Sequence, residues 1–80
     1  MLEIRILGPG CPRCHEVEKR TINALAELNV GADVQMITDL KKMAEYKIIG
    51  TPALVINSKV KCYGRIPSVN EIKEWIKGES

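Results

Sequence analysis

The chain has the sequence Cys11-Pro12-Arg13-Cys14 where an apolar run ends and a helical pattern begins. The preceding segment, Leu2–Leu7, alternates apolar and polar residues as a half-buried strand does, and Gly8-Pro9-Gly10 ends it. Pro12 suits the first position of a helix, because its missing N–H would have no intrahelical partner there. The pattern therefore predicts Cys11 at the N-cap, where free N–H groups and the positive end of the helix dipole favour a thiolate.

The two thiols predict redox chemistry. Cys11 is the expected nucleophile, and Cys14 lies one turn deeper, where it can close a disulfide. A C-x-x-C pair in a βαβ context is typical of a redox motif. A zinc site is the alternative, since Cys11, Cys14, His15 and Cys62 make four possible ligands. Cys14 and His15 are adjacent on the expected helix and point about 100° apart, so the redox interpretation is favoured.

Length and composition narrow the class of protein. Eighty residues predict a single domain spanning residues 1–80, and a net charge of +2 gives no reason to expect nucleic acid or a membrane surface. No apolar stretch is long enough to span a bilayer, and the first residues resemble a core strand rather than a signal peptide. Three cysteines, two of them close together, favour a reducing compartment and hence a cytoplasmic location. The protein is also expected to be a monomer.

The first half of the chain predicts a strand, a helix, a second strand and a short helix. The helix starting at Pro12 runs about four turns and stops at Asn29-Val30-Gly31. The second strand is Ala32–Ile37, and Thr38 or Asp39 can cap the short helix that follows. One face of the first helix carries Cys14, Val17, Thr21, Ala24, Leu25 and Leu28 at helical spacing. Val34 and Met36 fall on one side of the strand, and the short helix carries Leu40, Met43 and Ala44.

The second half predicts a hairpin and a final helix. Ala53–Ile56 is apolar on both faces, as a central strand is, and a turn at Asn57–Lys59 leads into a strand over Val60–Tyr63. Ser68 and Glu71 form a capping box that opens the last helix. The order is βαβαββα, with the first two strands parallel through a right-handed crossover and the last two antiparallel. In the last helix Val69, Ile72 and Ile76 are expected to face inward, and Gly78 to end it.

This order, with C-x-x-C at the first strand-to-helix junction, resembles the thioredoxin/glutaredoxin fold. The segment Tyr46–Pro52 is similar to the Y-x-I-x-G-x-P stretch of thioredoxins, whose proline is cis and lies against the active-site disulfide. Pro52 matches that proline, Thr51 matches the residue whose backbone pairs with the bound substrate chain, and Gly64 resembles the glycine after the last strand. The chain looks most like the small redox-active disulfide proteins. The resemblance implies an α/β fold with a four-stranded mixed sheet and three helices.

The resemblance also implies thiol–disulfide exchange. Cys11 would attack a protein disulfide, and Cys14 would resolve the mixed disulfide. The substrate would lie against Pro12, Arg13, Thr51, Pro52 and Gly64. No cofactor beyond the Cys11–Cys14 disulfide is expected, and a thioredoxin-reductase-like protein or a low-molecular-weight thiol would supply electrons. The alternatives are a non-catalytic thioredoxin-fold binding module and a metal-binding protein that uses Cys11 and Cys14.

One departure from the glutaredoxin pattern leads to a further expectation. Cys-Pro-x-Cys is the glutaredoxin-like form, but the last helix is preceded by Gly64-Arg65-Ile66-Pro67-Ser68 rather than by a Gly-Gly-x-Asp-type segment that holds glutathione. We therefore expect protein disulfides to be better substrates, on a flat surface made by Gly8-Pro9-Gly10, Ile49-Gly50-Thr51 and Gly64.

Four further residues are interpreted as structural. Cys62 alternates with Val60, which predicts a buried, inert thiol that faces away from the helix carrying Cys11. His15 is interpreted as a solvated helix residue, and Tyr63, together with Trp75, as packing.

Overall fold

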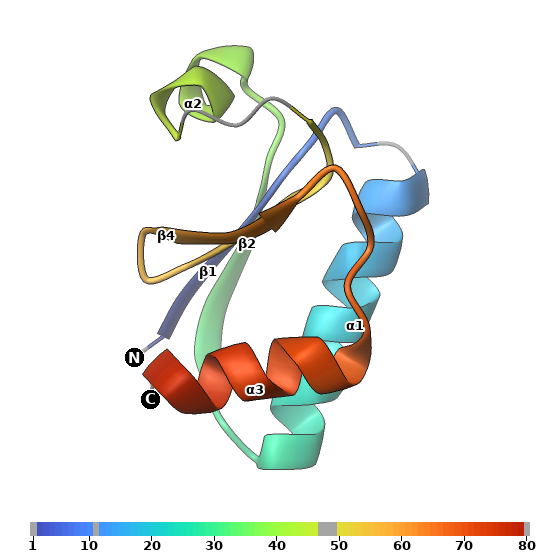
Figure 1. The fold of residues 1–80 in the computed structure, drawn as a ribbon, viewed down its shortest axis with the longest axis vertical. Helices are drawn as coiled ribbons and strands as arrows, with labels where there is room; N and C mark the ends of the chain where they lie inside the picture. The colour runs from blue at the N-terminus through green and yellow to red at the C-terminus, as the bar shows by residue number, and fades with distance from the viewer. Residues whose placement is uncertain (1, 11, 47–49, 80) are drawn as a thin grey trace.

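A computed structural model describes residues 2–10, 12–46 and 50–79. The elements follow the predicted order and form a four-stranded mixed sheet with three helices (Figure 1). No helix in these ranges is both long and apolar enough to cross a membrane. The elements are β1 (Leu2–Leu7), α1 (Pro12–Leu28), β2 (Ala32–Ile37), α2 (Leu40–Glu45), β3 (Ala53–Ile56), β4 (Lys59–Tyr63) and α3 (Val69–Glu79).

The strands are ordered β2-β1-β3-β4 across the sheet. β1 is parallel to β2, with Leu2 opposite Ala32, and antiparallel to β3, with Leu7 opposite Ala53. β3 and β4 form the predicted hairpin, and Asn57 and Ser58 both have positive φ, as a two-residue type I′ turn requires. Lys59 was expected in the turn but is the first residue of β4, because the two-residue turn already matches the twist of the strands.

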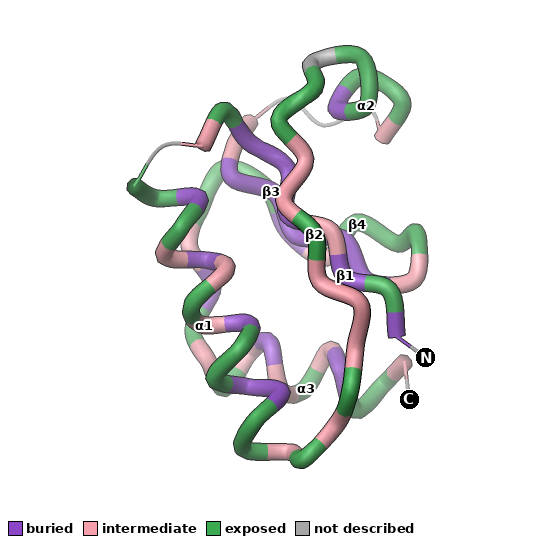
Figure 2. The backbone as a smooth tube through the Cα atoms, turned by 180° about the vertical axis from the view of Figure 1, so that it is seen from behind, coloured by how far each residue is buried: buried purple, intermediate pink, exposed green. Residues whose placement is uncertain are grey.

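The main core lies between the sheet and the helices α1 and α3, which cover the same face (Figures 1 and 2). The hydrophobic stripe of α1 predicted from the sequence is buried, and Leu28 packs at its edge. All four residues of β3 are buried, which confirms it as an interior strand. The buried cluster of this face comprises Leu2, Ile4, Ile6, Val17, Ala24, Leu25, Leu54, Ile56, Cys62, Ile72 and Ile76.

The opposite face of the sheet has a smaller cluster near α2. Met43 packs there with Leu7, Ala53 and Val55. Because α2 has only six residues, it covers one end of the sheet. It therefore leaves part of that face open near β4, where Val60 is exposed.

The helix ends are held by specific polar contacts. Asn29 takes positive φ directly after α1, and Asp39 caps α2 by accepting a hydrogen bond from the Lys41 N–H at 2.9 Å. The prediction that Gly78 ends α3 is wrong, because the helix continues to Glu79. The reason is tertiary: Glu79 accepts charge-assisted hydrogen bonds from lysines on β4, and these hold the last turn.

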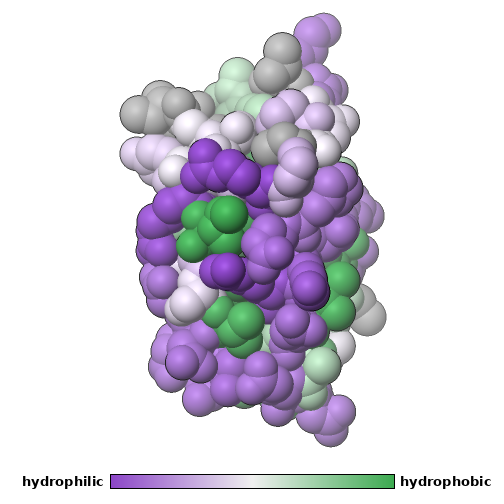
Figure 3. All heavy atoms as spheres, turned by 90° about the vertical axis from the view of Figure 1, so that its right-hand side faces the viewer, coloured by the Kyte–Doolittle hydropathy of each residue, from purple (hydrophilic) through white to green (hydrophobic). Residues whose placement is uncertain are grey.

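The outer side of α1 is mainly hydrophilic, with separated apolar patches (Figure 3). Ile22 is 52% exposed there. A groove of about 400 Å³ lies at the C-terminal end of α1, at the opposite end of the helix from the two-cysteine motif. It is lined by Ile22, Leu25, Ala26, Asn29, Val30 and Gly31.

Candidate active site

Cys14 is completely buried in the first turn of α1. Its Sγ atom packs against Gly8, the residue after β1: a Cβ atom added to Gly8 would overlap that sulfur. The same Cβ position is 3.8 Å from the Cβ of Thr51. The end of β1, the start of α1 and the segment before β3 therefore meet at the Cys14 thiol. Cys11, with its predicted N-cap position, lies outside the described residues.

The segment entering β3 has the geometry that the resemblance implied. The Thr51–Pro52 peptide bond is cis, and Pro52 is buried. Residues 47–49 of the matching stretch lie outside the described residues. Thr51 precedes the first paired residue of β3, Ala53, so its peptide groups lie beyond the sheet ladder.

Gly64 is placed beside Pro52 although twelve positions separate them in the sequence. Its N–H donates to the Pro52 carbonyl at 3.0 Å, and its φ is +76°. A Cβ added to Gly50 would be 3.2 Å from the Gly64 Cα, so these two glycines let the backbones approach closely. The structure thus brings three predicted site residues together: Thr51, Pro52 and Gly64.

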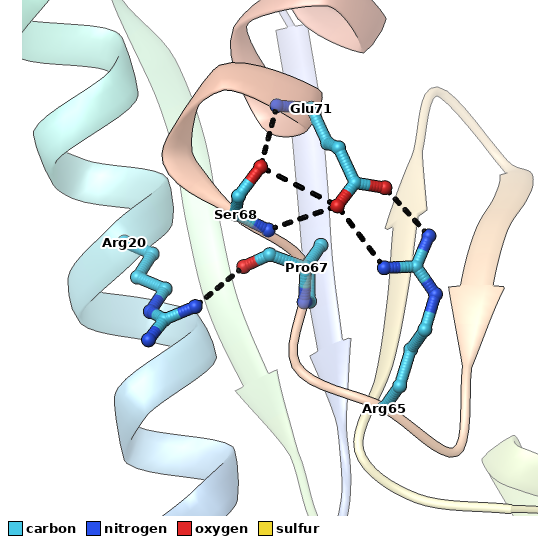
Figure 4. Close-up of polar contacts among 5 residues, drawn as sticks. All are labelled: Arg20, Arg65, Pro67, Ser68 and Glu71. Atoms are coloured by element: carbon cyan, nitrogen blue, oxygen red, sulfur yellow. Dashed lines mark hydrogen bonds and ion pairs between the residues drawn. The ribbon is translucent and has the colours of Figure 1, made fainter.

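The entrance to α3 is closed by polar contacts within the protein (Figure 4). The predicted capping box is present: the Glu71 N–H donates to Ser68 Oγ, and the Ser68 N–H donates to Glu71 Oε1, both at 3.2 Å. Arg65 donates to both oxygens of Glu71, at 2.7 and 3.2 Å. Its hydrogen bonds, followed by that of the Ser68 N–H, lower the pKa of Glu71 to about 2.

Comparison with known proteins agrees with this geometry. The family model described as a thioredoxin domain matches residues 2–77. The chain belongs to the thioredoxin family. It is 38% identical over 77 residues to a thioredoxin from Methanocaldococcus jannaschii, covering 96% of this chain and 88% of that protein. It is 32% identical over 74 residues to a thioredoxin from Methanothermobacter thermautotrophicus, covering 92% and 96%. As a member of this family it is a thiol–disulfide oxidoreductase.

Other predicted residues of this thioredoxin-family site differ in exposure. Pro12 and Arg13 are exposed on the first turn of α1. His15 is solvated, with its side chain 64% exposed and its Nδ1 3.9 Å from Glu18. Gly8 was expected to form part of the flat surface but is buried, because the Cys14 sulfur packs directly on it.

Cys62 is buried as predicted, but on the other face of the sheet. It is opposite Leu54 and belongs to the core cluster beneath α1 and α3, whereas Val60 is opposite Val55 on the α2 face. A bulge between Leu54 and Val55 causes the difference, because an extra residue in β4 reverses the alternation of side chains. Burial raises the pKa of the Cys62 thiol.

Tyr63 is 48% exposed rather than packed, since it is opposite Ala53 on the face that α2 covers only in part. Trp75 packs at the edge of the core, and the Arg65 guanidinium lies 6.0 Å from its ring centre.

Among the described residues, three possible ligands of a zinc site, Cys14, His15 and Cys62, do not form a metal-binding group. In the part of the chain that the structure describes, no group of three or more His, Cys, Asp and Glu residues could hold a metal ion. His15 faces solvent, whereas Cys14 and Cys62 are buried in the protein. The described residues therefore lend no support to the metal-binding alternative.

Two parts of the site could not have been found from the sequence. Arg65 and Glu71 are six positions apart across a loop and a helix start, which is not a recognised pairing distance, and Arg20 on α1 donates to the Pro67 carbonyl 47 positions away, at 3.1 Å. The capping-box pattern in the sequence predicted that Glu71 lies at the start of α3, but it did not predict that Arg65 pairs with it.

Proposed function

We propose that Cys11 and Cys14 form a redox-active pair that reduces protein disulfides. The observation that carries this proposal is the position of Cys14: its sulfur is buried between Gly8 and α1, next to the Thr51 that precedes a cis proline. A buried second thiol suits the resolving role, since it can react only with a sulfur already held at the site. Cys11, three positions earlier and directly before α1, is the nucleophile.

The exchange transfers two electrons and two protons. The Cys11 thiolate attacks one sulfur of the partner disulfide, so that a Cys11–partner bond forms, the partner's own S–S bond breaks, and the departing thiolate takes a proton. Cys14 then loses its proton and attacks the Cys11 sulfur. This step forms the Cys11–Cys14 disulfide, breaks the Cys11–partner bond and releases the second partner thiol after protonation. A dithiol of a reductase, or a low-molecular-weight thiol, then reduces Cys11–Cys14.

The partner chain would bind in an extended form beside the thiols. Thr51 can pair with it through backbone groups that lie beyond the sheet ladder, in the manner of strand addition. Pro52 follows Thr51 through a cis peptide bond. A Cβ added to Gly64 would meet no atom within 4 Å, so Gly64 leaves room for a passing backbone. Pro12 and Arg13 line the same region from the exposed first turn of α1.

Protein disulfides are favoured over glutathione because Arg65, Ser68 and Glu71, three polar residues at the α3 entrance, are bound to one another. The Ser68 N–H and the Glu71 N–H are used in the capping box. The Arg65 guanidinium is forked onto Glu71, so its charge is already matched by a carboxylate. A glutathione carboxylate would have to compete with Glu71 for Arg65.

We further propose that residues 1–80 act as a single cytoplasmic domain that is monomeric and needs no cofactor beyond its disulfide. The pair of close cysteines supports a reducing compartment.

Trapping tests the proposed function. In Cys14→Ser the mixed disulfide between Cys11 and a partner cannot be resolved, so incubation with native, disulfide-bonded insulin should give a covalent complex that dithiothreitol releases. Cys62→Ser is the matched control and should give no trapped complex, because Cys14 remains. A complex formed by the double variant Cys11→Ser/Cys14→Ser, or no complex with Cys14→Ser, would overturn the assignment.

A further inference from the structure

The connection between β4 and α3, residues 64–68, is held in place at one end by a contact with the candidate site. The N–H of Gly64 donates to the Pro52 carbonyl at 3.0 Å. Gly64 has φ of +76° and is exposed, so it lies at the surface beside the cis proline. A partner chain paired with Thr51 would pass this glycine, and its position therefore shapes the binding surface.

The residue after Gly64 is fixed by a two-pronged ion pair. Arg65 Nη2 donates to Glu71 Oε2 at 2.7 Å, and Arg65 Nη1 donates to Glu71 Oε1 at 3.2 Å (Figure 4). Two parallel hydrogen bonds fix the orientation of the guanidinium as well as its distance. The same guanidinium lies 6.0 Å from the centre of the Trp75 ring, which limits its movement on the second side.

The Glu71 carboxylate holds both the arginine and the start of α3. Its Oε1 also accepts the Ser68 N–H at 3.2 Å. One carboxylate thus joins both ends of the Arg65–Ser68 segment to the first turn of the helix. A third contact comes from α1, where Arg20 donates a hydrogen bond to the Pro67 carbonyl at 3.1 Å. Arg20 is itself oriented by a hydrogen bond from its Nε to Glu16 Oε2 at 2.8 Å.

We propose that Arg65 is a positioning residue for partner binding, acting through its ion pair with Glu71 to keep Gly64 against Pro52. This inference rests on the proposed function. Residues 64–68 form a connection without helix or strand, and an unrestrained connection would sample many conformations. The ion pair between Arg65 and Glu71 restricts the conformations of this connection before a partner binds. The partner chain therefore binds to a surface that is already formed. A small disulfide that reaches the thiols without lying along this surface does not need it.

Two single substitutions remove the ion pair in different ways. Arg65→Gln removes the cation, and Glu71→Gln removes the anion while keeping a side chain that can still complete the capping box with Ser68. Arg5→Gln is the matched control, since Arg5 pairs with Asp33 at 3.2 Å on the part of the sheet around β1 and β2. Insulin reduction by each full-length variant is assayed with dithiothreitol as electron donor. For the small aromatic disulfide 5,5′-dithiobis(2-nitrobenzoate), each variant is reduced beforehand and freed of dithiothreitol, and the rate at which its own dithiol reduces this compound is measured.

Arg65→Gln and Glu71→Gln should each raise the KM for insulin by roughly three- to tenfold with little change in kcat. The double variant should be no worse than either single variant, because both remove the same interaction. Rates with the small disulfide should stay within about twofold of wild type. The Gly64 amide should exchange its hydrogen faster, by roughly tenfold, in both single variants but not in Arg5→Gln.

Several results would overturn the role of Arg65. They are an unchanged KM for insulin, an equal loss with both disulfides, the same rise in KM in Arg5→Gln, or an unchanged Gly64 exchange rate. A wild-type protein that reduces neither disulfide would instead overturn the proposed function, and this outcome is visible before any variant is measured.

Discussion

The Sγ atom of Cys14 occupies the space that a side chain on Gly8 would need. The residue directly after β1 and a thiol in the first turn of α1 are thus in direct contact. The sulfur can lie at this end of the sheet because the residue that follows β1 has no side chain. The buried position of Cys14 therefore depends on Gly8 as much as on the helix.

Gly8→Ala should displace the Cys14 sulfur. Overpacking of a buried position costs about 1–3 kcal/mol, and the displaced thiol should also resolve mixed disulfides more slowly. Urea unfolding and the rate of insulin reduction would measure the two effects. Gly31→Ala is the control, because a Cβ at Gly31 meets no atom within 4 Å and should change neither quantity. Wild-type stability and activity in Gly8→Ala would contradict the contact.

Gly64→Ala and Gly78→Ala should change stability in opposite directions. Gly64 has φ of +76°, a conformation that costs an alanine about 1 kcal/mol or more. Gly78 lies inside α3 with open space around it, where alanine is the better helix former by about 0.5–1 kcal/mol. Thermal unfolding should show a lower Tm for the first variant and a higher Tm for the second. A destabilised Gly78→Ala would indicate that the last turn of α3 is not helical in solution.

Cys62→Ala should leave insulin reduction almost unchanged and cost about 1 kcal/mol of stability through a small cavity in the α1–α3 core. Kinetic assays and urea unfolding would separate the two quantities, with Ile22→Ala on the exposed side of α1 as the control. Loss of activity at unchanged stability would instead show that the Cys62 thiol takes part in the exchange reaction.

Cys62 should also contribute to the dependence of stability on alkaline pH. Burial raises the pKa of its thiol in the folded state, so the unfolded chain loses this proton first as pH rises. The contribution is present below the ordinary thiol pKa and decreases above it. The free energy of unfolding should therefore fall less steeply above about pH 9 in Cys62→Ala than in wild type. Parallel slopes for the two proteins would contradict the burial of this thiol.

Glu71 should titrate near pH 2 in the folded protein, because Arg65 and the Ser68 N–H stabilise its charged form. Its folded-state pKa lies below that of the unfolded chain. The stabilisation is therefore complete above the ordinary carboxyl pKa and is lost as pH falls from there to about 2. The stability difference between wild type and Glu71→Gln should shrink over this range, and NMR titration of the carboxyl carbon should give the midpoint. In Arg65→Gln the midpoint should move up, and a midpoint that stays near 2 would show that Arg65 is not the main cause.

Local sequence determined the elements and the motif of this protein. The alternation in Leu2–Leu7, the stripe on α1 and the reciprocal pair Ser68 and Glu71 are each set by neighbours a few positions apart, so their spacing is visible in the sequence. The two cysteines and the proline between them indicated the chemistry, and the segment ending in Thr51-Pro52 indicated the family.

Tertiary structure alone decided which residues meet. Whether Cys62 faces α1 or α2 depends on one extra residue in β4. The sequence around Val60 and Cys62 does not reveal that this extra residue exists or where it lies. Gly78 stays helical because lysines of β4 form hydrogen bonds with Glu79. Arg65 pairs with Glu71 only because the loop after β4 folds back onto the start of α3. At Gly78 a contact with strand β4 outweighs a local preference of about 1 kcal/mol, and such a contact exists only once the chain has folded.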